Sequence, residues 1–155
     1  MTISELEQVK RKLEHYCAYQ ERCHAEVESK LYALKVPRSY HAQIMVYLIE
    51  ENYLNEQRFA VSFARGKHTI SYWGKRRIEL ELKQRNISAY LIRFALNEID
   101  EQVYQSNFEK ISLQRWESLE NKALLQRKKS LTDYLYRKGY GYEMICNRIE
   151  DLLSE

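Results

Sequence analysis

Hydrophobic residues along the chain follow one spacing that recurs three times. The frame begins at Val27, recurs 51 residues later, and recurs again 53 residues after that. Of its 21 positions 20 are apolar, although apolar residues make up only 45% of the chain, and Arg148 is the exception. Steps of three and four residues are typical of amphipathic helices, so we predict one helical unit repeated three times. The three sets of positions are Val27, Leu31, Val36, Tyr40, Ile44, Met45 and Leu48; Ile78, Leu82, Ile87, Leu91, Ala95, Leu96 and Ile99; and Leu131, Leu135, Tyr140, Met144, Arg148, Ile149 and Leu152.

Each frame contains a break in the helical rhythm at the same place. The residue at the break is Lys35, Asn86 or Gly139, and Asn and Gly tolerate the left-handed backbone that ends many helices. Pro37 and Ser88 stand at equivalent places where the next helix should begin. Proline lacks an N–H that would be unpaired there, and a serine hydroxyl can cap free amides. The pattern therefore predicts a helix, a short turn and a second helix in every frame.

A further amphipathic segment precedes each frame, and Asn55 is the expected N-cap of the second one. The segments are residues 4–20, 55–66 and 103–118.

The chain is therefore expected to be all-α, with three tandem three-helix repeats in an elongated, curved arrangement. Only four Gly and one Pro interrupt 155 residues rich in helix formers. Units of about 50 residues bury too little surface to be very stable alone and gain from their neighbours. The expected repeats are residues 1–53, 54–102 and 103–155.

Residues typical of catalysis or metal binding do not form a recognisable pattern. The four histidines have no nucleophile or acid at a catalytic spacing, and no glycine-rich phosphate-binding motif is present. The spacing of Cys17, Cys23 and His24 matches no familiar zinc site. We therefore expect no enzymatic activity, no cofactor and no metal, with all three cysteines as reduced thiols.

No apolar stretch approaches the roughly 18 residues that would cross a bilayer. The first residues are a charged amphipathic segment without the apolar centre of a signal peptide. We expect a cytoplasmic monomer without membrane contact.

Positive charge is concentrated in the second and third predicted repeats. Residues 65–93 carry eight Lys or Arg against two Glu, a net charge of +6, and residues 110–138 carry eight against three acids, a net of +5. Residues 1–64 have a net charge of −1. Such a field attracts polyanions or an acidic protein surface in a salt-dependent way. The residues expected to form this partner-binding or DNA-binding basic face are Arg65, Lys67, Lys75, Arg76, Arg77, Lys83, Arg85, Lys128, Lys129, Arg137 and Lys138.

The same residues have a purely structural interpretation. Ile78 and Leu82 face the core in the repeat frame, so the neighbouring cations would then be solvated side chains on the opposite face. Trp73 could stack on a nucleic-acid base, or it could pack against the helix that follows it. Both interpretations stay open at the level of sequence.

Three motifs in order resemble the RecX family of bacterial recombination regulators. They are YLNEQRFAVSFARGK from Tyr53, W-G-K-x-x-I-x-x-E-L-K-x-x-x-I from Trp73, and L-x-R-K-G-Y-x-Y-E-M-I from Leu135. The resemblance extends from about Tyr16 to Leu153. It implies three tandem three-helix repeats, a cytoplasmic location and no catalytic activity. It also implies binding to the RecA recombinase in the groove of its filament on single-stranded DNA, which limits filament growth, ATP hydrolysis and strand exchange.

A helix-turn-helix protein that binds duplex DNA is the competing hypothesis, because a turn joins the last two helices of each predicted repeat. The residues able to read base edges at the start of the third helices are Arg38, Gln43, Arg93 and Asn147, and they share no pattern across repeats. A structural scaffold without nucleic acid is the third possibility.

The repeat frame makes Leu82 a core residue. We predict that Leu82→Ala lowers the free energy of unfolding by about 2–5 kcal/mol, because it loses transfer free energy and leaves a cavity. Thermal or chemical denaturation measures this effect, and an unchanged stability would contradict the core assignment.

Overall fold

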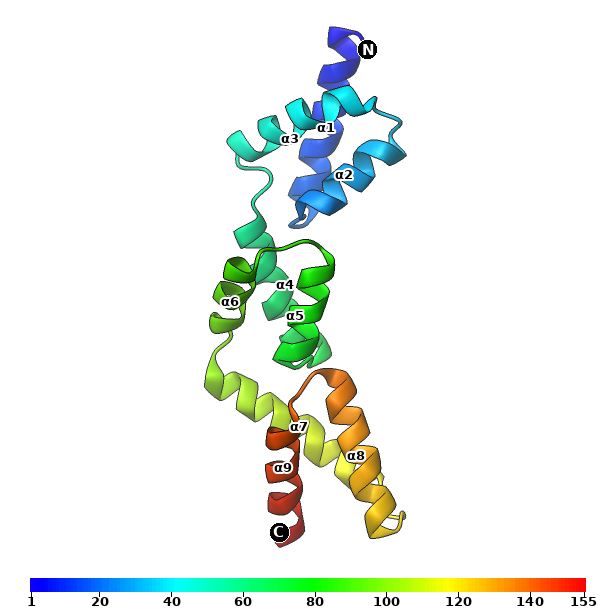
Figure 1. The fold of residues 1–155 in the computed structure, drawn as a ribbon, viewed down its shortest axis with the longest axis vertical. Coiled ribbons are helices and arrows are strands. Elements are labelled where there is room, and N and C mark those ends of the chain that lie inside the picture. The colour runs from blue at the N-terminus through cyan, green and yellow to red at the C-terminus, as the bar shows by residue number, and fades with distance from the viewer.

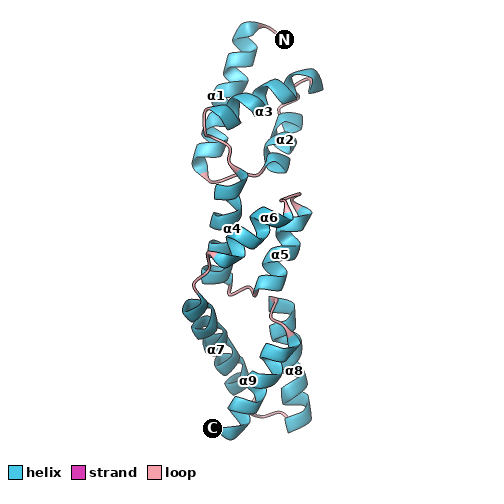
Figure 2. Cartoon of the chain, turned by 60° about the vertical axis from the view of Figure 1, so that its left-hand side comes forward, coloured by secondary structure: helices cyan, strands magenta, loops and turns pink.

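The computed structural model describes residues 1–155, and it contains helices, turns and loops without a β-strand (Figure 2). The predicted all-α fold is confirmed. The helices follow one another along a single long axis, with the N-terminus at one end and the C-terminus at the other (Figure 1). The elements are α1 (Ile3–Tyr19), α2 (His24–Ala33), the 3₁₀ turn η1 (Arg38–Tyr40), α3 (His41–Glu50), α4 (Glu56–Ser71), α5 (Lys75–Gln84), α6 (Ala89–Asn97), α7 (Glu101–Ser118), α8 (Leu124–Lys138) and α9 (Tyr142–Ser154).

Each of the three predicted turns has one residue in the left-handed region of backbone conformation. Lys35 and Asn86 both have φ 59°, and Gly139 has φ 111°. In each turn the following amide donates to the carbonyl five residues earlier, and the N···O distance is 3.1 Å in all three cases. These hydrogen bonds join Val36 to Leu31, Ile87 to Leu82, and Tyr140 to Leu135.

Burial also repeats along the frames. The fourth and sixth positions of each frame are half-buried, whereas the other positions are buried. Leu82 is completely buried. Arg148, the polar exception, is buried as well: its Nε donates to Ser112 Oγ at 2.7 Å and its Nη2 donates to the Glu109 carbonyl at 3.2 Å. The arginine therefore bonds α9 to α7 where the other frames have an apolar contact.

Helix α4 is longer than predicted. It continues to Ser71 rather than ending at residue 66, and Tyr72 closes it in the left-handed conformation with φ 57°. The buried series Ala60, Ala64 and His68 continues at steps of four residues past Gly66. Because the last buried position of the series is a histidine rather than an apolar residue, the apolar pattern predicted a helix that ends too early.

The core consists of two separate clusters. The smaller one lies among α1, α2 and α3 and includes Leu13, Val27 and Leu31. The larger one extends without a break through α4 to α9 and also takes in Cys23, which precedes α2. We keep the three repeat boundaries as a proposal; Leu54, just after the first boundary, is buried in the smaller cluster.

Polar contacts attach the first three helices to α4. Arg58 Nε donates to Glu21 Oε1 at 2.8 Å, and Arg58 Nη1 donates to Asn52 Oδ1 at 2.9 Å. The amide of His24 donates to Glu56 Oε2 at 3.1 Å. One arginine therefore bonds both the loop after α1 and the loop after α3.

The attachment of α5 to α8 is different, because two backbones touch there. The amide of Gly74 donates to the Lys138 carbonyl at 2.7 Å, and the amide of Arg76 donates to the Gly139 carbonyl at 3.1 Å. A Cβ on Gly74 would lie 2.4 Å from the carbonyl carbon and oxygen of Gly139. We call this contact, formed by residues 71–77 and 136–140 with Tyr104, the glycine joint.

The glycine joint can be tested with a pair of glycine substitutions. We predict that Gly74→Ala destabilises the protein by about 1–3 kcal/mol, because the added methyl group meets backbone that has no free rotamer to yield. Gly66→Ala is the matched control: nothing lies within 4 Å of its added Cβ, so it should stabilise α4 by about 0.5–1 kcal/mol. Chemical denaturation of both variants measures the difference, and equal signs would argue against the close backbone contact.

Candidate partner-binding surface

Three of the predicted cations alternate with two aromatic rings on the side of α4 and α5. Arg85 Cζ lies 4.8 Å from the centre of the Phe63 ring, and Lys67 Nζ lies 4.9 Å from that of Trp73. Arg77 Cζ lies 4.1 Å from the centre of the Trp73 ring, and the Trp73 and Phe63 rings form a T-shaped pair with centres 6.3 Å apart. We call Phe63, Lys67, Trp73, Arg77 and Arg85 the cation–aromatic cluster.

The cluster decides the role of Trp73 in this structure. Two cations and a second ring lie against it, so the indole is packed within the protein rather than left open for a base. A guanidinium stacked on a ring keeps the N–H groups at its edge available for carboxylate or phosphate oxygens. The cluster can therefore bind an anion through Arg77, although its rings are occupied, whereas Arg85 Nη1 already donates to the Glu81 carboxylate at 2.9 Å.

Further predicted cations belong to the glycine joint. The ammonium of Lys75 pairs with the Glu101 carboxylate and lies 4.7 Å from the Tyr104 ring. Arg76 lies 4.2 Å from the Tyr136 ring, and its Nη2 donates to the Tyr136 hydroxyl at 2.9 Å. These side chains connect α5 to α7 and α8, so a merely solvated face is the wrong description of this end of α5.

The opposite side of the joint supplies two more of the predicted residues. Lys138 Nζ donates to the Ser71 carbonyl at 2.9 Å, and the Arg137 carbonyl accepts a bond from Arg77 Nη1 at 3.4 Å. The Arg137 side chain itself is exposed. Four predicted cationic side chains and the Arg137 backbone thus meet at the joint, in two segments that are about 60 residues apart in the sequence.

The remaining predicted cations lie apart from both groups. Lys83 pairs with Glu79 at 3.1 Å and Lys129 pairs with Asp133 at 3.0 Å, each within its own helix. Lys128 and Lys129 lie in the half of α8 that is away from α5 (Figure 1). Arg65 is exposed on α4 and lines a hollow with residues of α6. The structure therefore does not gather all eleven residues on one continuous patch.

The candidate base readers of the helix-turn-helix hypothesis do not meet either. All four are exposed, but they lie on η1, α3, α6 and α9.

His68 lies beside the glycine joint and is a residue that the sequence did not reveal. It is completely buried, with Nδ1 3.0 Å from the Trp73 carbonyl and Nε2 3.1 Å from Asn107 Nδ2 on α7. Since the Asn107 amide donates to Nε2, the proton must lie on Nδ1, which donates to Trp73. The only sequence signal for this position is its place four residues after Ala64.

Two buried tyrosines complete the joint. The Tyr140 hydroxyl donates to the Tyr72 carbonyl at 2.8 Å, and the Tyr104 hydroxyl accepts from the Lys75 amide at 2.9 Å. Burial raises the pKa of Tyr104 from 10.0 to about 12 and raises that of Tyr140 further. Tyr140 needs its proton to donate to the Tyr72 carbonyl, whereas Tyr104 stays neutral because burial disfavours its charged form.

Comparison with known proteins matches this architecture. Residues 55–96, which cover α4, α5 and most of α6, match the family model of the second three-helix domain of RecX. The chain is 26% identical over 140 residues to the regulatory protein RecX of Bacillus cytotoxicus, and equally to that of Bacillus cereus. The chain is a RecX family protein. These alignments cover 90% of the chain but 52% of each relative, so the chain spans about half the length of the curated relatives it matches.

Solved RecX structures share the fold. The crystal structure of RecX from Lactobacillus salivarius aligns with a TM-score of 0.85 over 99% of this chain and 100% of its own, at 21% identity. A crystal structure of a regulatory protein RecX aligns with a TM-score of 0.79 over 90% of this chain and 70% of its own, at 22% identity.

In this RecX family chain, two of the motifs that carry the resemblance meet in space. W-G-K at residues 73–75 lies against K-G-Y at residues 138–140 in the glycine joint. The motifs are thus explained by a contact between repeats. None of the helices combines the length and the hydropathy that a bilayer crossing requires.

Alkaline pH should weaken the glycine joint. Tyr104 and Tyr140 hold their protons to higher pH in the folded protein than in the unfolded chain, so the folded state binds more protons above pH 10. Stability is then full below about pH 10 and falls as pH rises toward 12, by up to about 2 kcal/mol from Tyr104. Urea denaturation between pH 8 and 12 measures the loss.

Phenylalanine variants isolate the tyrosine contribution, since burial also raises the pKa of Cys17 and Cys23 to about 11. Tyr104→Phe should flatten the decline in stability with pH, whereas Tyr90→Phe, at a residue 65% exposed on α6, should leave it unchanged. An identical slope in both variants would remove Tyr104 from the explanation.

Proposed function

We propose that this RecX family protein regulates the RecA recombinase by lying in the groove of the RecA filament on single-stranded DNA. In that position it limits filament growth, ATP hydrolysis and strand exchange. The relatives are named regulatory proteins, and this supports an action by binding rather than by catalysis.

The observation that carries the proposal is the elongated shape of a RecX family chain. A row of helices with its termini at opposite ends (Figure 1) extends further than a compact globule of this length, and can therefore contact more than one subunit of a helical filament. A protein that bridges neighbouring subunits holds their relative positions, and ATP hydrolysis and strand exchange depend on those positions changing.

Charge supports the same proposal. Edge N–H groups of Arg77 in the cation–aromatic cluster remain able to bind carboxylates or phosphates, whereas the charge of Arg85 is already paired with the Glu81 carboxylate at 2.9 Å. We propose that the cluster and two exposed cations outside it, Lys83 and Arg137, contact the filament. Lys75, Arg76 and Lys138 instead hold the glycine joint, and their replacement would alter the shape of the protein as well as its charge.

The contact is tested by neutralising Lys67, Lys83 and Arg85 to Gln together. These variants keep most of the side-chain stems that cover the rings, and they leave the glycine joint intact. We expect half-inhibition of RecA ATP hydrolysis on single-stranded DNA to need about a tenfold higher protein concentration and to depend less on salt. Each lost ionic contact removes a small contribution to the binding free energy, and salt screens that contribution.

A matched control removes three exposed cations elsewhere: Arg38→Gln, Arg93→Gln and Lys122→Gln. It should inhibit like the unmodified protein. If the control loses as much inhibition as the cluster variant, the contact lies elsewhere. If the unmodified protein at micromolar excess leaves ATP hydrolysis and strand exchange unchanged, the proposed function is wrong.

A further inference from the structure

The first helices carry an open groove that none of the predicted basic-face residues lines. It lies along α1 and α2 and has a volume of about 680 Å³. Its walls are mostly apolar surface, and no carboxylate is among its lining residues. The residues that matter are four cations and two rings: Arg11, Lys12, Arg22, Lys30, Tyr16 and Tyr19.

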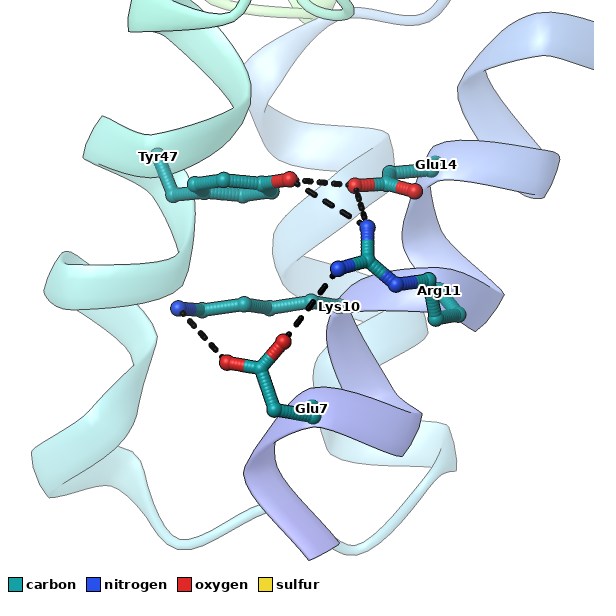
Figure 3. A network of polar contacts seen from close by, with 5 residues as sticks. All are labelled: Glu7, Lys10, Arg11, Glu14 and Tyr47. Carbon is teal, nitrogen blue, oxygen red and sulfur yellow. Dashed lines mark hydrogen bonds and ion pairs between the residues drawn. The ribbon is translucent and has the colours of Figure 1, made fainter. Parts of the chain in front are cut away.

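Three of the four cations are uncompensated. Arg11 is bound by Glu14 at 2.5 Å and by Glu7 at 3.3 Å, in the polar network that connects α1 to Tyr47 of α3 (Figure 3). Lys12, Arg22 and Lys30 have no acidic side chain within 4 Å. The groove is therefore cationic, although residues 1–64 as a whole have a net charge of −1.

The two tyrosine rings of the groove differ in whether another side chain packs against them. Arg22 Cζ lies 3.7 Å from the centre of the Tyr16 ring, and its Nε donates to the Tyr16 carbonyl at 3.0 Å, which fixes the guanidinium at the end of α1. Tyr19 is 78% exposed, and no cation or ring lies against it. An unoccupied ring thus stands beside a fixed cation, whereas Trp73 in the cation–aromatic cluster is covered by Lys67 and Arg77.

We propose that this groove binds single-stranded nucleic acid. A base stacks on Tyr19, and the backbone phosphates lie against Lys12, Arg22 and Lys30. Stacked rings interleaved with cations along an open groove are the general arrangement for single strands, because every base offers a flat face and every nucleotide a negative charge. A duplex hides its base faces, and an acidic peptide would satisfy the cations while leaving the exposed ring unused.

The site is independent of the proposed function, so its test contains no recombinase. Fluorescence anisotropy measures binding of the whole protein to a labelled dT oligonucleotide of about 15 nucleotides, with a duplex and an acidic peptide of similar length as comparisons. Tyr19→Ala should weaken dT binding at least about fivefold, since stacking on an aromatic side chain contributes substantially for each base. Tyr19→Phe, which keeps the ring, should bind like the unmodified protein.

Charge reversal gives the second arm of the test. Lys12→Glu with Lys30→Glu should weaken binding further and make it less steeply dependent on salt. Tyr90→Ala and Lys122→Glu, at an exposed tyrosine and an exposed lysine outside the groove, are the matched controls and should change nothing. Circular dichroism confirms that each variant is folded.

Three results would overturn the proposal. One is an unmodified protein that does not bind dT at low salt, and another is a stronger affinity for the acidic peptide than for dT. The third is equal loss of dT binding in the groove variants and their controls, because the charge of the whole protein would then account for the binding.

Discussion

The close approach of two backbones at Gly74 and Gly139 is the constraint on which the arrangement of the last six helices depends. The amide of Gly74 reaches the Lys138 carbonyl at 2.7 Å, a distance that no side chain at Gly74 would permit. Gly139 also needs its left-handed φ to turn from α8 toward α9. Because the backbones touch, the side chains on either side close into one core from α4 to α9.

That contact explains how the cationic residues of the second and third repeats are used. Backbone hydrogen bonds at the joint leave carbonyls and tyrosine rings at its rim, and Lys75, Arg76, Arg77 and Lys138 cover them. Cation–ring contacts of this kind contribute roughly 0.5–1 kcal/mol each at exposed sites. Much of the positive charge of these segments therefore serves contacts within the protein. Fewer cations remain free to bind a partner than the net charge indicates.

The repeated helical frame could be predicted from sequence because it depends on local periodicity. Leu31, Leu82 and Leu135 each follow a helical spacing, and the turn that comes after them has the same hydrogen bond in every repeat. Even Lys35 adopts the left-handed conformation, which Asn86 and Gly139 tolerate more readily. It does so because the apolar positions before and after it belong to two helices, and the chain must turn between them.

The glycine joint could not be predicted in the same way. Gly74 and Gly139 are separated by 65 positions, and neither carries a side chain whose pattern could indicate a partner. His68 was missed for a related reason: it is buried because Trp73 and Asn107 satisfy both ring nitrogens, and Asn107 belongs to another repeat. The candidate site was correspondingly less predictable than the fold, since it depends on which cations these long-range contacts occupy.

The two ends of the protein are stabilised by different forces. Helices α4 to α9 share one apolar cluster of 20 buried residues that also includes Cys23, whereas α1 to α3 enclose a cluster of eight and are bonded to Arg58 and Glu56 of α4. Apolar burial contributes more per contact than ion pairs that remain partly exposed to water. In a row of repeats, stability is a sum of the units and the interfaces between neighbours. The interface after the first repeat is the polar one, so it is the interface whose strength depends most on salt.

That polar interface separates the two candidate binding surfaces. The groove lies on α1 and α2 before it, the cation–aromatic cluster lies on α4 and α5 after it, and the geometry of the interface sets the distance between them.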